Sequence, residues 1–106
     1  MEYSMTPRME AVAVRITGAI TEADGNTLRK MVDEVVQTTQ PRVELDLSLV
    51  PTIVSSGIGK LLALHKELKK QNRELIITGI HENLASLFSS IHLDKFFKIE
   101  TAGVTG

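Results

Sequence analysis

Two periodicities of apolar residues alternate along this chain, and they restrict its fold more than any other feature. Three short segments have the apolar pattern of strands: residues 10–17, 43–47 and 75–78. Two longer segments repeat apolar residues at intervals of three and four, as amphipathic helices do: residues 28–36 and 58–68. Weaker patterns predict a strand end with a turn at residues 4–8, a helix around 84–88 and a last strand at 96–99. Gly79 is predicted to turn the chain after the strand at residues 75–78.

The predicted order is strand, strand, helix, strand, helix, strand, helix, strand. This alternation indicates an α/β domain whose parallel strands are joined by right-handed crossovers. We find no internal repeat, low-complexity tract or linker, so we treat residues 1–106 as one domain with a core at about residues 10–100. Loops at the carboxyl ends of such strands are where ligands and partners usually bind.

The composition excludes several classes of function. A formal net charge of −1 and only three Phe and one Tyr argue against a nucleic-acid or membrane-surface binder. No apolar run reaches the ~20 residues that span a bilayer. The chain has no Cys, which excludes disulfides and thiolate metal sites and is compatible with a reducing cytoplasm.

The segment PTIVSSGIGKLL, residues 51–62, joins a strand to a helix and carries two adjacent serines. A serine can cap a helix through its hydroxyl, which explains one of the two, and Gly57 and Gly59 let the chain bend and pack closely. The segment lacks the spacing of a phosphate-binding P-loop and of a G-x-S-x-G nucleophile. A serine could instead be a phosphorylation substrate, because a helix N-terminus accommodates a phosphate.

The three histidines do not indicate catalysis. His65 lies on the apolar stripe of its helix, where a hydrogen-bonded histidine at the edge of the core is the commonest case. His81 and His92 lie in loop or helix-end positions, where we expect them to face solvent. No two of them have metal-ligand spacing on one helix face. We therefore expect no enzyme, no metal site and no cofactor.

An ordered set of motifs resembles the STAS domain family, in particular the bacterial anti-sigma factor antagonists. The central pieces are residues 43–48, Val-Glu-Leu-Asp-Leu-Ser, and residues 53–62, Ile-Val-Ser-Ser-Gly-Ile-Gly-Lys-Leu-Leu. Residues 16–20, 65–70, 74–79 and 91–97 are similar to family segments in the same order. The resemblance covers about residues 10–100 and implies a small mixed, mostly parallel sheet with helices packed mainly on one face.

The resemblance also implies a function in partner switching. The unphosphorylated family member binds a serine kinase of the GHKL type that is also an anti-sigma factor, and it is released when the kinase phosphorylates it. A phosphatase of the PP2C type reverses the modification. By position the modified residue is Ser55, with Ser56 as second choice and as the better candidate for the helix cap. The controlled output is transcription or another process, such as biofilm formation.

One position departs from the family pattern. The family usually has Asp immediately before the modified serine, and this chain has Val54. Phosphorylation could persist, because the base that accepts the serine proton is expected on the kinase. Alternatively, the chain could be a constitutive scaffold or adaptor that no covalent cycle controls. A carrier of a small ligand in an apolar pocket is a third, weaker hypothesis.

We expect partners to dock on the start of the helix at residues 55–60, flanked by the loops 21–25 and 79–82. In this expectation Gly57, Ile58 and Gly59 give close approach and apolar contact, and Lys60 meets an acidic partner. The docking residues are Val54, Ser56, Gly57, Ile58, Gly59, Lys60, Thr21, Asp24 and His81. The alternative for the lysines at residues 60–70 is a solvated helix face that has no role in binding. We expect a cytoplasmic bacterial protein that is monomeric when isolated.

Overall fold

The computed structural model describes residues 1–100, and residues 101–106 of the expected domain lie outside the described part. The strands are β1 (Glu2–Pro7), β2 (Ala11–Thr17), β3 (Arg42–Leu49), β4 (Glu74–Ile80) and β5 (Lys98–Ile99). The helices are α1 (Gly25–Val36), α2 (Ser55–Lys70) and α3 (Glu82–Ser90), with short 3-10 helices η1 (Glu22–Asp24) and η2 (Leu93–Lys95). The order of strands and α-helices is the order predicted from the sequence.

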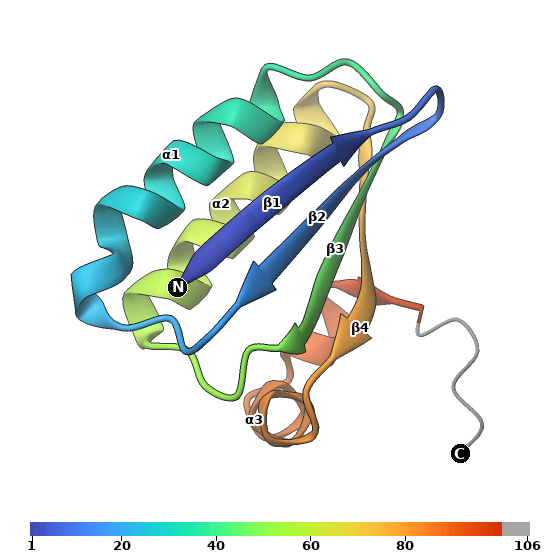
Figure 1. Cartoon of the computed structure of the whole chain (residues 1–106). Coiled ribbons are helices and arrows are strands. Elements are labelled where there is room, and N and C mark those ends of the chain that lie inside the picture. Colours follow the sequence, from blue (N-terminus) through green and yellow to red (C-terminus); the bar gives the residue numbers. More distant parts are fainter. Residues whose placement is uncertain (101–106) are drawn as a thin grey trace.

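The strands form one sheet in the order β1-β2-β3-β4-β5. β1 pairs antiparallel with β2, and the other three pairs are parallel, which confirms the mixed, mostly parallel sheet. Because β2, β3 and β4 are parallel, their carboxyl ends lie at one edge of the sheet, the lower edge in Figure 1. The loops that follow these three strands carry the residues expected to form the docking surface.

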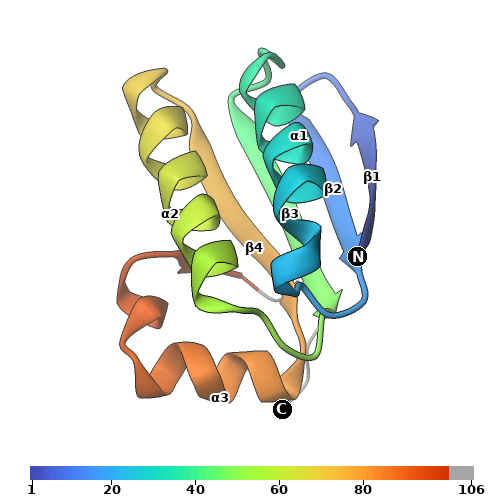
Figure 2. The same ribbon diagram turned by 90° about the vertical axis from the view of Figure 1, so that its left-hand side faces the viewer.

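The helices α1 and α2 cover one face of the sheet, while α3 lies across the end of the molecule (Figure 2). Each helix buries the stripe that its periodicity predicts: Leu28, Met31 and Val35 from α1, and Leu61, Leu64 and Leu68 from α2. These side chains meet alternate residues of the strands, such as Val12, Val14, Ile16, Val43, Leu45 and Leu47. Each buried aliphatic side chain stabilises the fold by about 1.5–3 kcal/mol, so this face holds the layers together.

The end of the chain differs from its prediction. β5 covers only Lys98–Ile99, not residues 96–99. Phe97 is buried before the strand begins, with its ring 5.8 Å from that of Phe88, while Phe96 is 63% exposed. Phe97 is therefore a buried anchor and Phe96 is an exposed side chain, and both precede the strand.

The glycine after the predicted strand at residues 75–78 does not turn the chain. Gly79 lies inside β4, which extends to Ile80, and a Cβ atom there would lie 2.5 Å from Oδ1 of Asp46. The register between β3 and β4 shifts at this point. Glycine is therefore required for the close approach of β4 to the Asp46 side chain.

Candidate functional site

The loops after β2 and β3 are joined by backbone hydrogen bonds at the carboxyl edge of the sheet. The N–H of Ile20 donates to the carbonyl of Thr52, and the N–H of Val54 donates to the carbonyl of Ile20, each at 3.0 Å. The loop after β4 is attached to the same edge, because the N–H of His81 donates to the carbonyl of Leu47 at 3.1 Å. The structure thus places all three loops of the expected docking surface along one edge (Figure 1).

Ser55 and Ser56 are the first two residues of α2, and both are exposed. The N-cap position is occupied by Val54, whose extended backbone has φ −76° and ψ 160°. No side chain caps the helix, so the expectation that Ser56 is the cap is wrong. The physical reason is position: a capping hydroxyl must come from the residue before the first helical turn, and the chain enters the helix one residue before the serines.

The missing cap leaves hydrogen-bond donors at the start of α2. The carbonyl of Val54 accepts from the N–H groups of Gly57 and Ile58, at 2.9 and 3.1 Å. Within residues 1–100, the N–H groups of Ser55 and Ser56 have no hydrogen-bond acceptor. Such N–H groups, together with the positive end of the helix dipole, favour an anion at this place.

The two glycines of the motif have different environments. Gly57 is buried, and a Cβ atom there would lie 2.8 Å from Cγ1 of Ile53 and 3.0 Å from Cγ2 of Ile20. The close approach that Gly57 allows is therefore internal, which corrects its assignment to the docking surface. Gly59 is exposed and has no atom within 4 Å of its Cβ position. Ile58 is half-buried and packs against the core.

The flanking loops hold their polar groups through local hydrogen bonds. Thr21 is the N-cap residue of η1, and its backbone N–H donates to the carboxylate of Asp24 at 2.6 Å. This backbone hydrogen bond is the main reason that the pKa of Asp24 is lowered. His81 is half-buried, so it is not fully solvent-facing as expected. Its Nδ1 accepts from the N–H of Asn83 at 3.0 Å and caps α3. Lys60 is half-buried on α2.

Of the other two histidines, His92 agrees with its prediction and His65 does not. His92 is exposed at a helix end, as predicted. His65 lies at the edge of the core with its ring 5.6 Å from that of Phe97. Its Nδ1 is buried and has no hydrogen-bond partner in the described part of the chain, so the expected satisfied histidine is not found. Burial, with a smaller effect of Lys69, lowers the pKa of His65.

Two polar centres, around Asp46 and Arg73, were not predicted from the sequence. Asp46 accepts from Nε of Arg15 at 3.1 Å and from the N–H of Ser48 at 2.9 Å. Burial alone would raise the pKa of Asp46, but the hydrogen bonds from Ser48 and Arg15 outweigh it and lower the pKa. The spacing Asp-Leu-Ser could have indicated that Asp46 and Ser48 share a face of the strand.

The second missed centre is Arg73, which is only 8% exposed. Its guanidinium donates to the carbonyl of Gln40 at 2.7 Å and to Oγ1 of Thr38 at 2.6 Å. It also donates to the carbonyl of Val35 at 3.4 Å, near the end of α1. Arg73 therefore fastens the loop after α1 to the start of β4.

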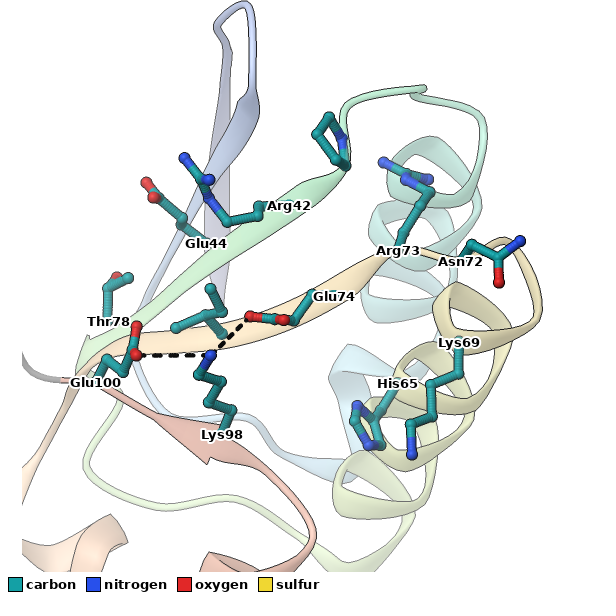
Figure 3. A pocket seen from close by; sticks show the side chains of 12 residues that line it. Arg42, Glu44, His65, Lys69, Asn72, Arg73, Glu74, Thr78, Lys98 and Glu100 are labelled. Atoms are coloured by element: carbon teal, nitrogen blue, oxygen red, sulfur yellow. Dashed lines mark hydrogen bonds and ion pairs between the residues drawn. The ribbon is translucent and has the colours of Figure 1, made fainter.

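One wide groove lies away from the serines, at the amino ends of β3 and β4. It has a volume of about 850 Å³, and most of its lining residues are charged. Figure 3 shows Lys98 between Glu74 and Glu100, with ion-pair distances of 3.1 and 3.7 Å. A small-molecule carrier needs a predominantly apolar pocket, and this groove does not offer one.

Residues 1–100 contain no group of three or more His, Cys, Asp or Glu side chains that could hold a metal ion. No helix in that range is both long and apolar enough to cross a membrane.

Comparison with known proteins identifies the family. Residues 3–102 match the model of the STAS domain, and the chain belongs to that family. An anti-sigma factor antagonist from Mycobacterium paratuberculosis is 21% identical, with 96% of this chain and 86% of that chain covered and a TM-score of 0.79. The match confirms the family resemblance carried by the sequence motifs.

The fold is also similar to structures of SpoIIAA. The anti-sigma factor antagonist SpoIIAA in its unphosphorylated form is 16% identical, with coverage of 99% and 100% and a TM-score of 0.75. The Bacillus cell fate determinant SpoIIAA in its phosphorylated form is 16% identical, with coverage of 95% and 93% and a TM-score of 0.70. At these identities the likeness demonstrates the shared fold.

Proposed function

We propose that this STAS domain is a non-enzymatic partner-switching regulator of the bacterial cytoplasm, controlled by phosphorylation of Ser55. The observation that carries the proposal is the exposed position of Ser55 at the first residue of α2, beside N–H groups that have no acceptor within residues 1–100. The proposal is supported by the similarity of this fold to SpoIIAA, which has structures in an unphosphorylated and a phosphorylated form. The partners are a GHKL-type serine kinase that is also an anti-sigma factor and a PP2C-type phosphatase.

The position of Ser55 allows modification without loss of the fold. In the reaction, the Ser55 hydroxyl attacks the γ-phosphorus of ATP, ADP leaves, and a base on the kinase takes the hydroxyl proton. The product carries about −1.5 to −2 charges and three acceptor oxygens. The N–H groups of Ser55 and Ser56 and the helix dipole stabilise that anion in place. The phosphate therefore changes the surface and leaves the packing beneath it intact.

The docking surface in this proposal combines the start of α2 with its two flanking loops. Val54, Ser56, Ile58, Gly59 and Lys60 come from α2 and the residue before it. Thr21, Asp24 and His81 come from the loops along the same edge. Gly57 contributes by allowing α2 to pack closely on Ile20 and Ile53 and does not contact the partner. The bare surface binds the kinase, and the added charge on Ser55 releases it.

The test measures the affinity of purified GHKL-type serine kinases of the host for five forms of the domain. We expect tight binding of the wild type and of Ser55→Ala, and at least a tenfold loss for Ser55→Asp. Ser4→Asp is the matched control, because Ser4 is an exposed serine on β1 and not part of the docking surface. Ser56→Asp tests the second-choice site in the same assay.

One observation favours a constitutive scaffold as the second candidate. Val54 occupies the N-cap, where the family usually has an acid, so no carboxylate is available there to orient the Ser55 hydroxyl. A scaffold would bind its partner equally well as wild type and as Ser55→Asp. Equal affinities, with no phosphorylation of Ser55 by any of the kinases, would replace the switch with the scaffold.

A further inference from the structure

We propose that a groove on α2 extends the docking surface and receives an apolar segment of the partner kinase that is flanked by acidic residues. The inference rests on the proposed function, because it names a further contact of the same partner. The α2 groove has a volume of about 590 Å³. Its apolar lining consists of Gly59, Leu62, Ala63 and Phe96, and its remaining lining residues are His65, Lys66 and Lys69.

Gly59 is the first reason to assign a partner to the α2 groove. A glycine inside a helix costs stability relative to alanine, so its presence calls for a steric reason. Gly57 has an internal reason, because its Cβ would collide with Ile53 and Ile20. Gly59 has none, because no atom lies within 4 Å of its Cβ position. Close approach of another molecule supplies the reason that the isolated domain lacks.

Phe96 is the second reason. Its side chain is 63% exposed, although the adjacent Phe97 is buried. Phe96 lines the α2 groove together with Leu62 and Ala63, so the exposed apolar atoms are gathered in one concave place. Aromatic side chains of this kind are enriched where proteins bind one another.

The α2 groove is continuous with the phosphorylation site. Ser55, Gly59, Leu62 and Lys66 follow one another at intervals of four, three and four residues. Residues at these intervals lie on one face of a helix. A segment seated in the groove therefore lies along the same face of α2 that begins with Ser55. The groove and the serine can be covered by one partner at the same time.

The charges around the groove determine the chemistry of its occupant. Lys66 and Lys69 line it, and none of the lining residues that the structure describes has a carboxylate. Lys70 is paired with Glu67 at 3.7 Å, whereas no ion pair of Lys66 or Lys69 is found within residues 1–100. A segment with apolar residues at its centre and Asp or Glu at its flanks complements this arrangement.

The experiment uses the purified kinase that phosphorylates Ser55 and measures both its affinity and its kinetics with variants of the groove. Ala63→Arg fills the groove at an exposed helical position. We expect its affinity to fall at least tenfold and the KM for phosphorylation to rise by a similar factor, with kcat unchanged because Ser55 is intact. Lys66→Glu is expected to weaken binding severalfold and to reduce its salt dependence.

Gln37→Arg is the matched control, because it adds the same charge at an exposed position after α1. Wild-type affinity of Ala63→Arg, together with loss of binding by Ser55→Asp, would overturn the groove and leave the proposed function standing. Absence of any kinase that modifies or binds the wild type would overturn both. A wild-type dimer that Ala63→Arg dissociates would assign the groove to a second copy of the chain.

Discussion

The same substitution should stabilise the domain at one glycine of α2 and not at another. Gly57 and Gly59 lie two residues apart in the first turns of the helix. Alanine is the better helix former by about 0.8–1 kcal/mol, and this gain applies to both positions. At Gly59 the new methyl group meets nothing within 4 Å. We therefore expect Gly59→Ala to raise the free energy of unfolding by about 0.5–1 kcal/mol.

At Gly57 the methyl group has no room. It would lie 2.8 Å from Cγ1 and 3.1 Å from Cδ1 of Ile53, and 3.0 Å from Cγ2 of Ile20. Ile53 and Ile20 are themselves buried, so neither can move without disturbing the core. Overpacking of this kind costs about 1–3 kcal/mol. Because the helix-propensity gain is common to both variants, Gly57→Ala should be less stable than Gly59→Ala by about that amount.

Urea unfolding followed by far-ultraviolet circular dichroism measures this difference, because the chain has no Trp to report by fluorescence. Thermal unfolding gives a second readout, because a difference of 1 kcal/mol corresponds to a shift in Tm of about 4–8 °C for a domain of this size. Two variants of equal stability would refute the packing of α2 against Ile20 and Ile53. A destabilised Gly59→Ala would show that its Cβ position is not open in the folded domain.

Three further outcomes are expected from the same unfolding assay. Val54→Asp places an acceptor at the uncapped start of α2 and should stabilise the domain by about 0.5–2 kcal/mol, and a destabilised variant would contradict the N-cap assignment. Arg73→Ala removes a buried donor to Gln40 and Thr38 and should cost about 2–4 kcal/mol, and a loss below 0.5 kcal/mol, the level of an ordinary surface change, would contradict that role. Burial lowers the pKa of His65, so the unfolded chain binds the proton first as pH falls, and stability should decline below about pH 6.5. The decline should be smaller in His65→Gln, and equal declines in the two proteins would contradict the lowered pKa.

The parts of the fold that the sequence predicted depend on local periodicity. Residues 43–47 alternate because one face of β3 is buried beneath the helices, and residues 28–36 repeat because one stripe of α1 is buried. Both patterns follow from a burial that every residue of the element shares. The family motifs also predicted the position of Ser55, because the serine of the motif stands at the start of a helix and Ser55 is the first residue of α2.

The parts that the sequence did not predict depend on contacts between distant residues. Gly79 was read as a turn because the side chain that requires it, Asp46, is more than thirty residues earlier. Ser56 was read as a cap because the capping position is decided by the backbone angles of Val54, which composition does not reveal. Arg73 follows the end of α2 in sequence, and its buried role depends on carbonyl groups of a different loop.

The most direct test of the switch is the intact mass of the domain, with mapping of the modified residue, after isolation from its native cells with phosphatases inhibited. The proposal predicts a single phosphate, located on Ser55, under at least one growth condition. A domain that remains unmodified under every condition, or that carries its phosphate on a residue outside the start of α2, would contradict it.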